Sequence, residues 1–208
     1  MDGIRFMAIL PLLMTSNEAL VEKWGSEVVD FGITADDPKI ISDVMAKASR
    51  EADAIMTTGG VSVGEEDHVK AVVESLGSID FWRIAIKPGK PFAFGDVNRT
   101  PFLGLPGNPV SALVTALVIA RPFLFDCQGI NHADVIPLRQ IAKFDRKGSS
   151  RIVYHRVRSG VDGVEIFKQQ SSGALYSTCW GDGLAVQEID EDIVKGRPVN
   201  VVPYEFFN

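Results

Sequence analysis

The sequence has very little cysteine and histidine. Cys127 and Cys179 are the only cysteines among 208 residues, too few and too far apart for a disulfide scaffold or a cysteine-rich zinc site. A reducing cytoplasm is the simplest compartment for such a chain. The histidines, His68, His132 and His155, have no metal-site spacing, and no Ser-His-Asp or Cys-His set emerges. We therefore interpret the histidines as structural or exposed.

Positive charge is also scarce. The formal net charge is −6, the sequence pI is about 5.1, and lysine and arginine do not cluster. A generic nucleic-acid binder needs such a cluster because it must neutralise phosphates. The composition therefore excludes that class, and any anionic ligand must be met by local groups.

Long apolar runs are few. Residues 6–14, FMAILPLLM, are too short to cross a bilayer and no small-x-small cleavage site follows, so we expect a buried strand or a disturbed N-terminus, with a signal peptide as the alternative. The segment at 108–125 begins with Asn108 as N-cap and Pro109 at the first helical position. Arg121 and Pro122 interrupt it, which favours a helix buried against a sheet over a membrane span.

What the sequence does contain, from about residue 19 to 128, is an alternation of strand-like and helix-like segments. Strands are expected at 27–33, 54–58, 81–86, 91–95 and 101–105, and helices at 36–53, 65–77 and 108–125. In the first of these helices Asp37 is the expected N-cap, followed by Pro38. Its expected apolar face is made by Ile40, Ile41, Val44 and Ala48. This order predicts an α/β fold in which helices cover both faces of a mostly parallel sheet.

The pattern changes after about Gly129. Short β-rich segments at 151–158, 164–168, 183–189 and 198–204 are separated by turns, the spacing of a small all-β barrel or sandwich. We therefore expect two domains, an α/β domain over residues 1–130 and a barrel-like β domain over 131–208.

The loop after the strand at 54–58, GGVSVGEED, is suited to an anion. Gly59 and Gly60 allow a close approach of the backbone, Ser62 adds a donor, and a helix N-terminus follows. The loop is neither a Walker loop nor GxGxxG. In open α/β sheets ligands lie beyond the carboxyl ends of the strands, where this loop is expected.

Three acids in the same loop oppose a bare phosphate. Glu65, Glu66 and Asp67 would repel the ligand unless a divalent metal with oxygen ligands stood between them. The alternative is that these acids only stabilise the helix N-terminus, by about 0.3–1 kcal/mol each.

Two further loops carry groups for an anion. The segment IKPGKP, residues 86–91, holds Lys87 and Lys90 between prolines and a glycine, which favours anion binding over a plain surface turn. The segment GLPGNPVSA, residues 104–112, contains Pro106 and Ser111, although a capped helix start would explain it as well. In a fourth loop, TADDPK, Asp36 is free to face the same sheet edge.

Three motifs together resemble one family. GGVSVGEEDHVK, FWRIAIKPGKPFAFG and GLPGNPVSALVT, in this order and spacing, are similar to molybdopterin molybdenumtransferase, the enzyme also represented by the E domain of gephyrin. Residues 171–202 look like the C-terminal β domain of that family. The resemblance implies a three-layer molybdopterin-binding α/β domain followed by a small β-barrel-like domain.

The resemblance also implies a reaction and partners. Adenylylated molybdopterin accepts molybdate, the nucleotide is released, and a divalent cation, normally Mg²⁺, assists. A cytoplasmic homodimer is expected, with molybdopterin adenylyltransferase as a further partner.

Matching motif positions imply the site residues. Asp36 and Asp67 would be the catalytic acids that handle metal and phosphate. The substrate-binding residues would be Gly59, Gly60, Ser62, Arg83, Lys87, Lys90, Pro106, Asn108, Pro109, Ser111, Arg151 and Ser172. Among them, Arg151 and Ser172 with the lysines could form the molybdate pocket.

The sequence departs from the family near its N-terminus. Two N-terminal domains of the family and a Thr-Gly-Asp-Glu-Leu-like acidic loop have no counterpart, and residues 14–17, MTSN, stand too close to Gly25 to match the family's Asp-Ser-Asn-like segment. We therefore expect a truncated or altered enzyme that binds molybdopterin or molybdate but inserts the metal poorly. A stand-alone molybdopterin adenylyltransferase and a non-catalytic binding or scaffold module are the alternatives.

Overall fold

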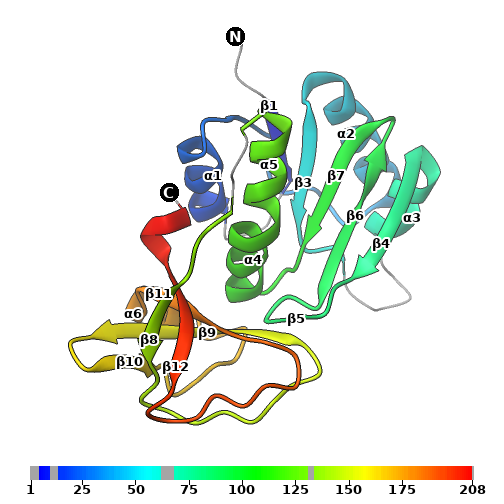
Figure 1. Ribbon diagram of the computed structural model, residues 1–208. Helices are drawn as coiled ribbons and strands as arrows, with labels where there is room; N and C mark the ends of the chain where they lie inside the picture. The colour runs from blue at the N-terminus through cyan, green and yellow to red at the C-terminus, as the bar shows by residue number, and fades with distance from the viewer. Residues whose placement is uncertain (1–4, 10–13, 62–67, 131–133, 208) are drawn as a thin grey trace.

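The computed structural model describes residues 5–9, 14–61, 68–130 and 134–207, and these form two β-sheets with helices around the first (Figure 1). The first sheet has the strand order β2-β1-β3-β7-β6-β4. Its strands are β1 (Arg5–Ile9), β2 (Glu27–Asp30), β3 (Ala54–Thr58), β4 (Gly77–Arg83), β6 (Pro91–Val97) and β7 (Thr100–Leu105). The pairings β1–β2, β1–β3 and β3–β7 are parallel, and β6 runs antiparallel to both β7 and β4. The prediction of a mostly parallel sheet is confirmed.

Helices cover both faces of this sheet, because its central strands alternate apolar side chains between two cores. In β3, Ala54 and Met56 belong to the core under α1 (Met14–Lys23) and the long helix of residues 109–127, whereas Ile55 belongs to the other core. That second core lies under α2 (Pro38–Glu51) and α3 (His68–Leu76), on the opposite side of the sheet in Figure 1. The three-layer α/β architecture follows from this period of two.

Helix α2 begins as the sequence predicts. The carboxylate of Asp37 accepts hydrogen bonds from the backbone N–H groups of Lys39 and Ile40, at 2.9 and 3.0 Å, and Pro38 is the first helical residue. The expected apolar face is partly wrong, because Ile40 is 45% exposed and Met45 is buried instead. Ile41, Met45 and Ala48 follow the spacing of four and three residues that keeps side chains on one helix face.

The helix that begins at Pro109 continues through Pro122, as the helix expected at 108–125 does. It runs through α4 (Pro109–Thr115), a π-helical segment η1 (Ala116–Ala120) and α5 (Arg121–Cys127). A proline lacks the N–H and its ring crowds the carbonyl four residues back, here that of Val118. The N–H of Arg121 instead bonds to Ala116, five residues back, and this wider π turn accommodates the proline.

The same helix has the length and composition of a membrane span. Residues 109–127 are 19 residues long with a mean hydropathy of 1.7, but 56% of the most apolar window is buried in the protein. Leu117 and Leu124 pack in the first core, and the guanidinium of Arg121 donates to the carbonyl of Phe207 at 3.2 Å. In this structure the helix is a core helix of the α/β layer.

The second sheet is antiparallel, in the order β10-β9-β11-β12-β8. Its strands are β8 (Leu138–Ile141), β9 (Ile152–Gly160), β10 (Gly163–Ile166), β11 (Gly183–Gln187) and β12 (Pro198–Pro203). Helix α6 (Tyr176–Trp180) lies between β10 and β11 in the chain, and a 3-10 turn, η2 (Tyr204–Phe207), follows β12. In the described residues, the isolated bridge between Ala142 and Val164 is the only ladder contact across the gap from β8 to β10, so the sheet is barrel-like but not closed.

One short strand connects the two sheets. The sequence predicts a single strand over residues 81–86, but β4 ends at Arg83 and a separate two-residue strand, β5 (Ile86–Lys87), follows. Strand β5 pairs in parallel with β9, Ile86 with Ile152 and Lys87 with Val153. The second sheet is therefore attached to the loop region beyond the first one.

Candidate anion-binding site

Two loops at the carboxyl ends of β3 and β7 lie against each other. The two strands pair in parallel with Thr58 opposite Leu105, so they end at the same level of the sheet. The N–H of Gly59 donates to the carbonyl of Leu105 at 2.9 Å. A side chain at Gly107 would place its Cβ 3.4 Å from the Cα of Gly59, and Gly59 itself has a φ of +86°. Glycine at both positions lets the loops approach this closely.

The segment of residues 84–90, which contains β5 and ends before β6, borders the same space; we call it the lysine loop. The N–H of Ile84 donates to the carbonyl of Lys90 at 3.3 Å, which closes the loop, and the Lys87–Pro88 peptide bond is cis. Gly89, with a φ of +116°, packs so tightly that a Cβ there would lie 2.6 Å from Thr115 Cγ2. Lys87 and Lys90 are both exposed at the rim of this loop.

The second sheet contributes the remaining wall. Pairing of β5 with β9 brings Arg151 beside the lysine loop, where its Nη1 donates to the carbonyl of Ile86 at 3.4 Å. The N–H of Val110, in the first turn of α4, donates to the carbonyl of Ser172 at 3.4 Å. Segments more than 60 residues apart in the chain thus converge at one place.

Buried Arg156 fixes the segment that carries Ser172. Its Nε donates to Ser177 Oγ at 3.1 Å and its Nη2 to the carbonyl of Ser171 at 3.2 Å. The side-chain amide of Gln170 exchanges two 3.0 Å hydrogen bonds with the backbone of Arg156. Burial lowers the pKa of Arg156 from its usual value, but a guanidinium remains charged at neutral pH. These residues were not predicted from the sequence; the only indication was weak, a charged residue, Arg156, within a β-rich segment.

These segments enclose a cavity of about 540 Å³, which we call the large cavity. Its volume is within the range of about 300–1,000 Å³ typical of small-molecule sites. It is lined by Gly59, Gly60, Val61, Lys87, Pro88, Gly89, Lys90, Pro91, Pro106, Gly107, Asn108, Ser111, Arg151, Gln170, Ser171 and Ser172. Among the described lining residues there are three cations and no carboxylate, so the large cavity favours an anion.

Most of the predicted site residues meet here. The large cavity includes nine of them, namely Gly59, Gly60, Lys87, Lys90, Pro106, Asn108, Ser111, Arg151 and Ser172. Pro109 begins α4 directly after Asn108. Arg83 and Asp36 are exposed and do not line the cavity. Ser62 and Asp67, together with Glu65 and Glu66, lie outside the described residues.

The expected magnesium site has no support from the described residues. No group of three or more His, Cys, Asp or Glu side chains that could hold a metal ion occurs within them. Asp36, exposed and away from the cavity lining, does not fit a magnesium site on its own. The carboxylates at 65–67 lie outside the described residues, so magnesium remains a prediction from the sequence.

Comparisons with known proteins agree with this geometry. A family described as "Probable molybdopterin binding domain" matches residues 18–126. The molybdopterin molybdenumtransferase of Haemophilus influenzae is 50% identical over 110 residues, which are 53% of this chain and 27% of that protein. The enzyme of the same name from Synechococcus elongatus is 34% identical over 188 residues, covering 87% of this chain and 46% of that protein. The chain thus spans less than half the length of these relatives.

A solved structure shows the same fold. The molybdopterin biosynthesis moea protein from Pyrococcus horikosii superposes with a TM-score of 0.83 at 23% identity, over 99% of this chain and 55% of that one. The match extends over both sheets, and the family match alone covers more than half of the chain. The chain belongs to the molybdopterin-binding domain family.

Proposed function

We propose that the chain binds the phosphate-bearing part of a molybdopterin in the large cavity and takes part in the insertion of molybdate during molybdenum cofactor biosynthesis. The observation that carries this proposal is the cationic lining of the large cavity at the carboxyl ends of β3 and β7. Ligands of open α/β sheets bind at this edge. The relatives named molybdopterin molybdenumtransferase support the choice of ligand.

Each wall of the large cavity has a distinct role in this proposal. Lys87, Lys90 and Arg151 hold oxyanion charge, and each charge-assisted hydrogen bond contributes roughly 1.5–3 kcal/mol. Gly59 and Gly60 bring backbone close to the ligand without side-chain obstruction. Ser172, Ser111 and Asn108 supply neutral donors that orient a phosphate or an incoming molybdate.

The proposed reaction is the transfer of molybdenum to molybdopterin that the relatives' name describes. That the molybdopterin is adenylylated and that the nucleotide is released are proposed from the sequence resemblance alone. Asp36 and Asp67 are proposed to handle metal and phosphate, with Mg²⁺ as the ion, on the strength of the sequence motifs. A homodimer, an adenylyltransferase partner and a cytoplasmic location are proposed on the same basis.

The test is nucleotide release from adenylylated molybdopterin in the presence of molybdate and magnesium. Lys90→Gln and Arg151→Gln should each weaken substrate binding about tenfold or more, the loss of one charge-assisted hydrogen bond. Lys39→Gln, which removes an exposed lysine on α2, is the matched control and should change nothing.

Other outcomes identify the alternatives. Consumption of ATP with free molybdopterin would make the chain an adenylyltransferase, and binding without any turnover would make it a scaffold module. Equal binding by wild type, Lys90→Gln and Arg151→Gln would refute the large cavity as the site. Light scattering during size-exclusion chromatography tests the homodimer.

A further inference from the structure

A second cavity of about 450 Å³ adjoins the large one. We call it the side cavity. The two share Lys87, Pro88 and Gln170. The outer wall of the side cavity is the loop of residues 146–150, and its inner wall comes from β9 and β11. No proposed role of the large cavity uses this outer loop.

The side cavity is lined by an unusual density of positive charge. Lys87, Arg146, Lys147 and Arg156 line it, and its described lining contains no carboxylate. Of these four, only Lys147 pairs with a carboxylate within the described residues, at 2.8 Å from Asp192. The acceptors of the buried Arg156 guanidinium are a hydroxyl and two backbone carbonyls, all neutral. A buried cation without a counter-ion is costly, and an anion in this space would offset that cost.

His155 adds a polar atom with no protein partner. The side chain is 5% exposed, and its Nε2 lies 2.8 Å from Oε1 of Gln187. The amide nitrogen of Gln187 donates to the carbonyls of Lys147 and Glu191, so Oε1 is the acceptor and Nε2 of His155 carries the hydrogen. Nδ1 of His155 is therefore the acceptor of the ring; it is buried, has no hydrogen-bond partner in the described part of the chain, and would give no hydrogen bond to an oxyanion, so the cations must hold the anion.

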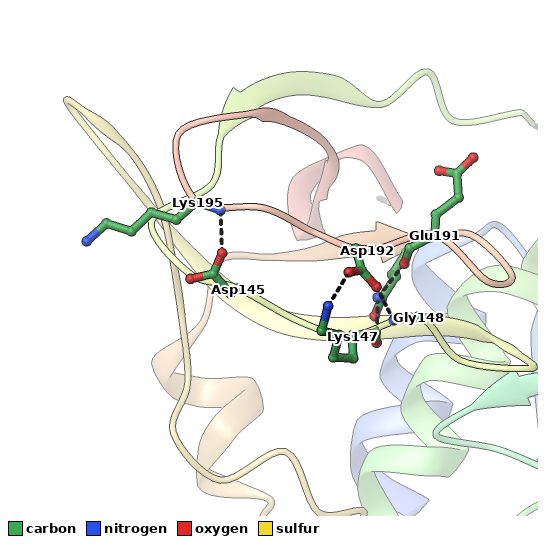
Figure 2. Close-up of polar contacts among 7 residues, drawn as sticks. Asp145, Lys147, Gly148, Glu191, Asp192 and Lys195 are labelled. Atoms are coloured by element: carbon green, nitrogen blue, oxygen red, sulfur yellow. Dashed lines mark hydrogen bonds and ion pairs between the residues drawn. The ribbon is translucent and has the colours of Figure 1, made fainter.

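The outer wall is held in place by its own contacts. Asp192 accepts from Lys147 Nζ at 2.8 Å and from the N–H of Gly148 at 2.7 Å, two contacts that can be followed in Figure 2. Beside them, Asp145 accepts from the N–H of Lys195 at 2.9 Å. The carboxylates of Asp145 and Asp192 thus fix the loop. Arg146, which lines the side cavity, donates from Nη1 to the carbonyl of Asp145 at 2.9 Å and has no carboxylate partner within the described residues.

We propose that the side cavity binds one small tetrahedral oxyanion, in addition to the anion held in the large cavity. Arg146 and Lys87 supply charge, Arg156 fixes the inner wall, and Ser149 and Ser150 add hydroxyl donors. A dianion of this shape fits because cations surround it from both walls and no carboxylate of the described lining repels it. The inference rests on the proposed function only for the occupant of the large cavity. The free oxyanion would bind beside that occupant, in the side cavity.

Calorimetric titration of the full chain with sodium molybdate, and separately with sodium sulfate, at low ionic strength tests the proposal. Wild type should bind two anions. Arg146→Gln should weaken one site about tenfold, as for the loss of one charge-assisted contact, and leave the other unchanged. Arg146→Lys keeps the charge and should stay within about threefold of wild type, because an ammonium retains the Coulomb attraction.

Two controls separate this proposal from the proposed function. Lys90 lines only the large cavity, so Lys90→Gln should weaken the anion site of the large cavity and leave that of the side cavity unchanged. Lys39→Gln should match wild type. A single anion per chain, or an Arg146→Gln variant that matches Lys39→Gln while circular dichroism shows a native fold, overturns the side cavity. An effect of Arg146→Gln with none from Lys90→Gln would instead count against the large cavity and leave the side cavity standing.

Discussion

Acidification should destabilise this protein through His155. Burial is the main reason that the pKa of His155 falls from 6.5 to about 4, and the nearby charges of Arg146, Arg156 and Lys87 lower it further. The hydrogen bond with Gln187 acts in the opposite direction but does not outweigh burial. The folded protein therefore keeps this imidazole neutral over a range in which the unfolded chain protonates it.

The sign and size of the effect follow from proton linkage. Because the folded pKa lies below the unfolded one, the contribution of His155 to stability is complete above pH 6.5 and is lost as the pH falls toward 4. Between pH 7.5 and pH 5 the unfolded chain gains nearly one proton at this site that the folded protein does not bind. The corresponding loss in the free energy of unfolding is about 2 kcal/mol.

Urea unfolding in a pH series, with His155→Gln as the control, measures this loss. Glutamine can still donate to Gln187 but does not titrate, while every carboxylate contributes equally in both proteins. The gap between the two free energies of unfolding should therefore change by about 2 kcal/mol between pH 7.5 and pH 5, at the expense of wild type. A gap that stays constant across the series would refute the buried, neutral state of His155.

Three further predictions concern single positions. Gly60→Ala would place a Cβ 2.3 Å from Val69 Cγ2 at a φ of +68°, so it should lower the free energy of unfolding by about 1–3 kcal/mol in urea. Gly196→Ala, with φ of +83° and open space around its Cβ, is the matched control and should cost less. Arg99→Gly should raise the free energy of unfolding by about 0.5–1 kcal/mol, and with it the melting temperature, because Arg99 holds a φ of +71° in a two-residue hairpin loop that favours glycine. Arg99→Ala should give no gain, since alanine does not relieve the positive φ. Because Lys90 is exposed, the difference in pyrophosphate affinity between wild type and Lys90→Gln should shrink when salt rises from about 0.05 to 0.5 M in calorimetry; an undiminished difference would contradict a screened contact.

Local sequence chemistry predicted the elements whose ends are set by their own residues. The cap at Asp37, the proline at the start of α2 and the buried strand at 54–58 all depend on neighbouring residues, and all are confirmed. The helix expected at 108–125 is confirmed, but the π turn that accommodates Pro122 was not predicted, because sequence rules for α-helices do not include it. The strand expected at 81–86 is split because Ile86 pairs with β9, a partner some 65 residues away.

The site divides in the same way. Glycine, proline and lysine in the loops after strands already indicated an anion site, because the carboxyl ends of neighbouring parallel strands meet at one sheet edge. The sequence did not predict the roles of Gln170 and Arg156. Gln170 lines both cavities and Arg156 fixes the loop of Ser172, but each acts through tertiary contacts within the second sheet's own region, between residues 14 and 15 positions apart, which no local sequence pattern shows.

Docking of the second sheet sets the charge of both cavities. Lys87 and Lys90 precede β6 of the first sheet, whereas Arg151 precedes β9 and Arg156 lies within it. The pairing of Lys87 with Val153 joins these groups, and the carbonyl of Ile86, which precedes Lys87, is also the acceptor for Arg151 Nη1. The first sheet alone would present the two lysines without Arg151 beside them, and single exposed charges contribute little because solvent screens them. The anion sites therefore belong to the junction between the two sheets, and substitutions that loosen the β5–β9 pairing should weaken anion binding even where no cation is removed.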